Sequence, residues 1–102
     1  MSNPDNPSYT YDMGIRMISG SDVTGGASAA QYAIENDNCQ AVRVSVKGAD
    51  ARIAVGNSSV SVTNTTGMLF QSGMTDLLRL KSTDTHIAYI GSSATINIVE
   101  CE

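Results

Sequence analysis

The sequence predicts an all-β fold, an antiparallel β-sandwich or jelly roll with an extended N-terminal arm. Short runs of alternating apolar and polar residues recur along the chain, and this alternation is typical of strands with one buried face. Clusters of Gly, Ser, Asn and Asp separate the runs at intervals of about 8 to 12 residues, as in sandwiches and barrels. Charged residues make up only 16%, while Ser, Thr, Asn and Gly are plentiful, which favours strands and turns over helices.

The length and composition indicate one folded domain preceded by a short arm. A chain of 102 residues with 41% hydrophobic residues is able to bury one modest core. Residues 1–13 show no core periodicity, and Pro4 and Pro7 bias the residues before them towards extended backbone. We therefore expect an extended N-terminal arm at 1–13 and a single β-sandwich domain at 14–102.

The first part of the domain has the least regular pattern. Residues 14–19 alternate weakly and are expected to form a strand, followed by a loop over the glycine-containing residues 20–26. The alanines of the next stretch favour a helix by propensity. Because Tyr32 and Ile34 alternate with polar neighbours, we nevertheless expect a strand at 30–35.

The clearest alternation lies in the middle of the chain. The segment QAVRVSVKG, residues 40–48, alternates valine with polar residues and predicts a strand with one buried face. Strands are expected next at 51–56 and 60–63, separated by a turn at GNSS, and then at 68–70, 76–81, 86–91 and 95–100. The expected core consists of Val42, Val44, Val46, Ile53, Val55, Leu78, Leu80, Ile87, Ile96 and Ile98.

No arrangement of catalytic or metal-binding residues is recognisable. The single histidine, His86, begins an expected strand and is expected at an edge or on the surface, and a GxSxG motif is absent. Most of the 10 acidic residues fall at turns, and none forms a calcium-loop pattern. Glu100 and Glu102 are expected to be solvated because they lie near the C-terminus. We therefore expect a protein that is not an enzyme and has no catalytic residues, metal or cofactor.

Charge and hydropathy argue against nucleic acid and membranes as partners. The net charge is −4, and the 6 Lys and Arg residues are scattered singly, whereas nucleic-acid binding needs a basic patch. No apolar run is long enough to span a bilayer, and the polar N-terminus does not have the pattern of a signal peptide. Cys39 and Cys101 match no metal or redox spacing. We expect two free thiols in a protein made without export, although a disulfide remains geometrically open.

Residues 40–100 combine the strand AVRVSV, a strand ending in IAVG, a Ser/Thr-rich segment, the turn GMLFQSG, and the final strands HIAYIG and TINIVE. In this order of strands and turns, the chain resembles small β-rich virion proteins of tailed bacteriophages. The turn departs from the more usual Leu-Pro-Ala-Gly of such proteins, because no proline precedes Gly73.

The resemblance implies a decoration or cement protein that binds the outer surface of a phage capsid and performs no reaction. Its partners would be the major capsid protein and further copies of itself, for example in a trimer, and its location the virion after synthesis in the host cytoplasm. An extended arm suits such binding, because it is able to add a strand to a neighbouring subunit. The candidate interaction residues are Pro7, Tyr9, Tyr11 and Met13. The alternative for these residues is a disordered terminus.

Two other functions fit the same pattern. The chain could be a head–tail connector, tail or receptor-binding component of the virion. It could also be a small carbohydrate-binding module, although 4 Tyr, 1 Phe and no Trp provide few aromatic platforms for sugars.

Overall fold

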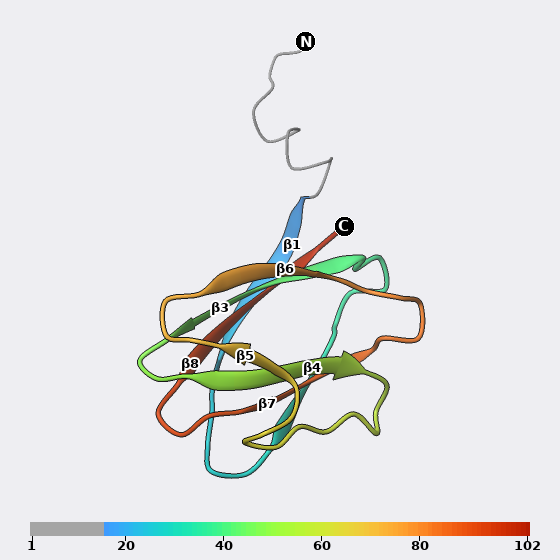
Figure 1. Ribbon diagram of the computed structural model, residues 1–102. Helices are drawn as coiled ribbons and strands as arrows, with labels where there is room; N and C mark the ends of the chain where they lie inside the picture. Colours follow the sequence, from blue (N-terminus) through green and yellow to red (C-terminus); the bar gives the residue numbers. More distant parts are fainter. Residues whose placement is uncertain (1–15) are drawn as a thin grey trace.

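The computed structural model describes residues 16–102, which contain eight strands and no helix (Figure 1). The predicted all-β class is therefore confirmed. The strands form two antiparallel sheets of four. Their bounds are β1 Met17–Thr24, β2 Ala30–Ala33, β3 Ala41–Lys47, β4 Ala51–Gly56, β5 Met68–Phe70, β6 Thr75–Arg79, β7 His86–Ile90 and β8 Thr95–Cys101.

The strands pair in a nested order. One sheet, here called sheet A, has the order β1-β8-β3-β6, and the other, sheet B, has the order β2-β7-β4-β5. The first strand thus pairs with the last, the second with the seventh, the third with the sixth and the fourth with the fifth. The β3–β8 and β4–β7 pairs then join these hairpin-like units into continuous sheets.

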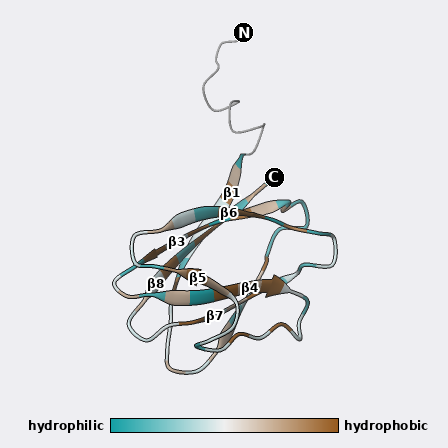
Figure 2. Cartoon of the chain, viewed as in Figure 1, coloured by the Kyte–Doolittle hydropathy of each residue, from teal (hydrophilic) through white to brown (hydrophobic). Residues whose placement is uncertain are grey.

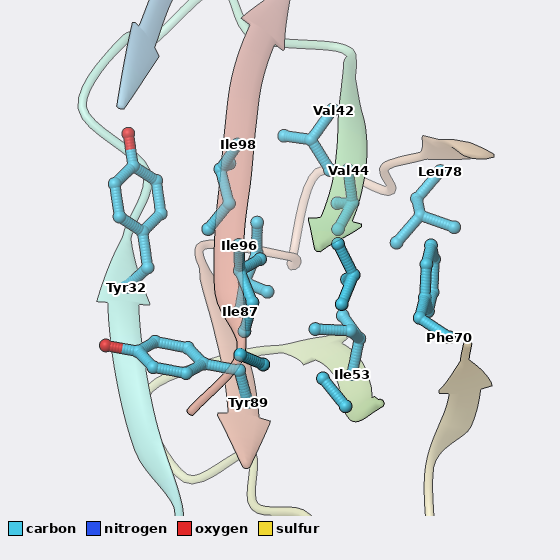
Figure 3. Packing of buried hydrophobic residues seen from close by; sticks show 13 residues of the cluster. Tyr32, Val42, Val44, Ile53, Phe70, Leu78, Ile87, Tyr89, Ile96 and Ile98 are labelled. Carbon is cyan, nitrogen blue, oxygen red and sulfur yellow. The ribbon is translucent and has the colours of Figure 1, made fainter. Parts of the chain in front are cut away.

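The core lies between the two sheets, which face each other as in a β-sandwich. Most hydrophobic residues lie within the strands, whereas most of the connecting loops are hydrophilic or neutral (Figure 2). Figure 3 shows the valines of β3 and isoleucines of β8 packed against side chains of sheet B. The buried side chains include Val42, Val44, Ile96 and Ile98 from sheet A, and Ile53, Phe70, Ile87 and Tyr89 from sheet B.

The period-two pattern predicted this core well. The expected strands at 40–48 and 51–56 correspond to β3 and β4, and the last four expected strands correspond to β5 to β8. Val55 and Leu80 are only partly buried, and every other residue of the expected core is buried.

Three expectations for local structure are wrong. Residues 20–24 belong to β1 instead of a loop, because their backbone pairs with β8 and Asp22 points outward beside Asn97. Residues 60–63 form no strand, since their valines pack on a sheet face instead of pairing at its edge. β2 also ends at Ala33, earlier than expected, because the amides of Glu35 and Asn36 turn towards Glu100.

Candidate interaction surfaces

Three large apolar side chains are exposed around β5. Met68, Leu69 and Met74 keep 41%, 46% and 37% of their surface accessible to solvent. β5 is one of the two edge strands of sheet B, so one side of its backbone has no strand partner. Exposed apolar side chains beside a free strand edge are typical of a surface that binds another protein. We call Met68, Leu69 and Met74 the apolar edge.

The neighbouring edge strand of sheet A has a different character. β6 carries the exposed charged residues Asp76 and Arg79. Asp76 is paired with Val44 and therefore lies on the core-facing side of its strand, although it is exposed at the edge. Charges placed this way discourage strand addition, because an added strand would have to cover them. The apolar edge of β5 is thus the more suitable of these two edges for binding a partner.

The outer face of sheet B is covered by residues 57–67, here called the strap. Val60 and Val62 of the strap pack on Ala54, Ala88 and Ile90, which form a second, small apolar cluster. Ala88 and Ile90 alternate with the core residues of β7, so they point away from the main core. The Ser/Thr-rich stretch of the sequence therefore serves to cover a sheet face.

Polar contacts hold the strap in place. The Nε2 atom of Gln31 on β2 donates hydrogen bonds to the backbone oxygens of Ser58 and Val60, each at 2.8 Å. Within the strap, the amide of Thr63 donates to the hydroxyl of Thr66 at 2.9 Å. These bonds satisfy backbone groups that a ladder of strand pairing would otherwise satisfy.

The outer face of sheet A carries short polar side chains in rows across the strands. Asn97 Nδ2 donates to Asp22 Oδ1 at 2.8 Å, and the hydroxyls of Ser45 and Thr75 lie 2.9 Å apart. A depression of about 270 Å³ opens on this face between β1, β8 and β3. It is lined by Asp22, Ser45, Val46, Lys47, Thr95 and Asn97.

A buried carboxylate lies at the end of the core. Glu100 is fully buried and accepts hydrogen bonds from the Tyr32 hydroxyl and from the amides of Glu35 and Asn36, both at 3.0 Å. Asn36 Nδ2 donates to the same carboxylate at 2.8 Å and also lies 3.1 Å from the hydroxyl of Ser19. The cluster thus joins β8, β2, β1 and the β2–β3 loop, and it is the structural anchor of that loop.

The expectation that Glu100 is solvated is therefore wrong. Burial by itself raises the pKa of the Glu100 carboxyl, but the hydrogen bonds from Tyr32 and the 35–36 segment outweigh this effect and lower the pKa. Burial, followed by the hydrogen bond to Glu100, raises the pKa of the Tyr32 hydroxyl. The raised pKa keeps the Tyr32 hydroxyl protonated and the lowered pKa keeps Glu100 ionised, so Tyr32 donates the hydrogen bond to the Glu100 carboxylate. Glu102, in contrast, is only partly buried and forms an ion pair with Arg16.

The two cysteines are free thiols in the structure, as expected. Cys39 is partly exposed in the β2–β3 loop, and its thiol donates to the backbone oxygen of Ala41 at 3.3 Å. Cys101 is buried at the end of β8. Burial raises the pKa of both thiols, which makes them weak nucleophiles near neutral pH.

The structure does not describe the interaction residues singled out from the sequence. Pro7, Tyr9, Tyr11 and Met13 lie outside the described residues, as does the whole expected arm at 1–13. His86 is half-buried at the start of β7, with Nδ1 2.8 Å from the hydroxyl of Thr85. The side chains of the apolar edge and of the sheet A depression were not predicted. The shortness of the apolar run at 68–70, flanked by turns, was the available signal for an exposed edge strand.

Membrane spans, metal sites and known proteins give no further indication of function. Residues 16–102 contain no helix that is long and apolar enough to cross a membrane. In the same part of the chain, no group of three or more His, Cys, Asp or Glu side chains is placed to hold a metal ion. Comparison of the chain with protein-family models, with curated proteins and with solved structures finds no match. Function is therefore inferred from strand order, surface chemistry and the sequence pattern.

Proposed function

We propose that this protein is a non-enzymatic virion protein of a tailed bacteriophage that binds the outer surface of the capsid and stabilises it. The structural observation that supports the proposal is the nested strand pairing. This pairing favours the jelly roll that we propose, an architecture common in viral capsid domains and in lectins. A fold alone does not select a function. The resemblance of residues 40–100 to small virion proteins is what favours the capsid over the other uses of this architecture.

The apolar edge is the surface that we assign to the capsid contact. Docking would bury Met68, Leu69 and Met74 and would offer the free backbone of β5 to a strand of a capsid subunit. β5 has only three residues, so each contact is small. Many copies on one shell compensate, because binding to the assembled shell adds to shell stability at every occupied site.

The proposed arm supplies a second contact. In this proposal, residues 1–13 cross to a neighbouring subunit, where Pro7, Tyr9, Tyr11 and Met13 bind. Tyrosine suits this role, since it buries a large area with few rotatable bonds. The described chain begins beside its own C-terminal residue, where Arg16 and Glu102 exchange backbone hydrogen bonds at 2.9 Å. The described residue nearest to the proposed arm is therefore held on the β1–β8 pair.

Co-sedimentation with undecorated capsid shells tests the apolar edge. The double variant Met68→Ser, Leu69→Ser changes two exposed side chains and is expected to weaken shell binding at least tenfold, a loss of about 1.4 kcal/mol per site. Met17→Ser is the matched control, because Met17 is 70% exposed but lies at the start of β1. Equal weakening in both variants, or none in the double variant, would contradict the assignment.

Deletion of residues 2–11 tests the arm separately. The truncated protein is expected to keep the melting temperature of the full chain and to bind shells more than tenfold more weakly. Equal occupancy of full-length and truncated protein at limiting concentration would remove the arm from the mechanism. The apolar edge would then be the remaining candidate contact.

Copy number distinguishes decoration from the connector or tail alternative. A decoration protein is expected in numbers comparable to the capsid subunits, whereas a connector or tail component is present as one ring or a few copies. Quantitative mass spectrometry of purified particles measures this ratio. Sedimentation of the isolated protein tests the accompanying proposal that it forms a homo-oligomer such as a trimer.

A further inference from the structure

The depression on the outer face of sheet A has an unusual arrangement of polar groups. Asp22 on β1 and Lys47 on β3 lie on either side of β8, two strand spacings or about 10 Å apart across the sheet. They are also offset by two residues along β8, because Asp22 pairs with Asn97 and Lys47 pairs with Thr95. Thr95 and Asn97 lie between them on β8. The depression therefore has an acceptor side, a donor side, and a floor with groups of both kinds.

Much of the hydrogen-bonding capacity of these groups is unused. Asp22 Oδ1 accepts from Asn97 Nδ2, which fixes both side chains. Within residues 16–102, the second oxygen of Asp22 and the ammonium of Lys47 take part in no hydrogen bond or ion pair, and the amide oxygen of Asn97 accepts none. These side chains are exposed or partly exposed, so a ligand is able to reach them. A ligand that both donates and accepts would satisfy all of them together.

Most ligand classes do not match this set. A phosphate would meet one cation but also the Asp22 carboxylate, which repels it. A hard cation needs several oxygen ligands, and Asp22 is the single carboxylate of the depression. An added peptide strand needs a free sheet edge, whereas the depression lies over β8, an interior strand of sheet A. Sugar hydroxyls, in contrast, each donate and accept, and neighbouring hydroxyls pair well with planar carboxylate and amide groups.

We propose that this depression binds one sugar residue of a glycan, with Asp22 and Asn97 holding neighbouring hydroxyls and Lys47 donating from the opposite side. The volume of about 270 Å³ suits a single ring. No aromatic side chain lines the depression, so the dissociation constant is expected to be about 1 mM. Tight binding to a surface that carries many glycans then requires many copies of the protein on one particle. This requirement is the one part of the inference that rests on the proposed function.

A nuclear magnetic resonance titration of the isotope-labelled full chain tests the site. The probes are the methyl glycosides of glucose, galactose, mannose and N-acetylglucosamine, each at up to about 50 mM, which saturates a site of this affinity. At least one glycoside is expected to shift the amide signals of residues 22, 45–47 and 95–97 along saturable curves. Glycerol at the same concentration is expected to produce no such curves.

Variants decide whether the named side chains bind the sugar. Asp22→Ala and Lys47→Ala are each expected to weaken binding at least fivefold, a loss of about 1 kcal/mol. Arg43→Ala changes an exposed side chain of the same face outside the depression and is expected to leave binding unchanged. The absence of saturable shifts with every glycoside, equal shifts with glycerol, or unaffected binding in the first two variants would overturn the proposal. Because no capsid is present, failure here leaves the proposed shell binding untouched.

Discussion

The Tyr32 hydroxyl on β2 donates a hydrogen bond to the Glu100 carboxylate on β8, and this bond joins the two sheets across the end of the core. Glu100 follows Ile96 and Ile98 in the alternation of β8, so its side chain enters the core with theirs. Its charge is stabilised there by N–H and O–H donors, which include the backbone amides of Glu35 and Asn36 just after the end of β2. The ring of Tyr32 lies among the apolar side chains of the core (Figure 3), and its hydroxyl makes a polar contact at the end of that core.

Tyr32→Phe removes this bond and keeps the ring. The free energy of unfolding is expected to fall by about 1.5–3 kcal/mol, the usual range for a buried hydrogen bond to a charged group. Tyr89→Phe is the matched control, because Tyr89 is also a core tyrosine but its hydroxyl bonds to none of residues 16–102. Urea denaturation measures both variants. Equal losses would mean that the Tyr32–Glu100 bond adds nothing to stability.

The stability of the protein is expected to fall in acid because of Glu100. The pKa of this carboxyl is lowered in the folded state from an ordinary value of 4.5. Its contribution is therefore fully present above about pH 5 and is lost as the pH falls through the lower, folded-state pKa.

Glu100→Gln provides the measurement of this effect. The variant is expected to be less stable than the natural protein near neutral pH, because the Gln amide is uncharged and its N–H₂ faces other donors. The difference in unfolding free energy should shrink as the pH is lowered to about 3. Glu102→Gln is the control, since its surface ion pair with Arg16 contributes about 1 kcal/mol or less. A difference that stays constant with pH would contradict the buried carboxylate.

Alanine substitutions at Gly67 and Gly73 distinguish the cost of backbone strain from the cost of steric overlap. Both have positive φ, at 90° and 95°, which alanine adopts only at a cost of about 1–2 kcal/mol. A Cβ at Gly67 would overlap the Cγ2 atom of Val62 in the strap, whereas a Cβ at Gly73 meets no atom within 4 Å. Gly67→Ala is therefore expected to lower the unfolding free energy by clearly more than Gly73→Ala. Thermal denaturation compares the two, and equal losses would show that the strap does not pack tightly there.

The two thiols are expected to react at different rates. A thiol count on denatured, unreduced protein should find two free groups, because the structure contains no disulfide between Cys39 and Cys101. In the native protein, Cys39 should react first, since it is partly exposed while Cys101 keeps only 4% of its surface accessible. The variant Cys39→Ser should lack the fast phase of labelling. A single phase for both thiols in the native protein would contradict this order.

The sequence allowed the core to be predicted because the core depends on a local pattern. Alternation along residues 41–47 and 95–100 puts Val44 and Ile98 on the buried face of their strands, and this result does not depend on which strands are neighbours. The same alternation places Glu100 inside, whereas acidic residues near a chain end are usually solvated, and in this protein the alternation is the better guide. The donors to Glu100 come from β2 and from the loop after it, which only the folded chain brings near.

Features that depend on distant pairing were harder to predict. Val60 and Val62 alternate as in a strand, but they are buried by a sheet face and not by a neighbouring strand. The polar residues of β1 have low strand propensity, and they are held extended by their pairing with β8. The sheet A depression is formed by three strands, with Asp22 and Asn97 far apart in the sequence, so no short motif marks it.

The nested order of strand pairs has a consequence for how the chain folds. The innermost pair, β4 with β5, closes the shortest loop, and each successive pair outward joins segments further apart in the sequence. Closing β1 on β8 directly would carry a large entropy loss, but formation of the inner pairs first brings these ends close together. Folding is thus expected to begin with the β4–β5 hairpin and to add the β3–β6, β2–β7 and β1–β8 pairs in that order. Because most contacts are long-range, the whole process should be slow for a chain of this size.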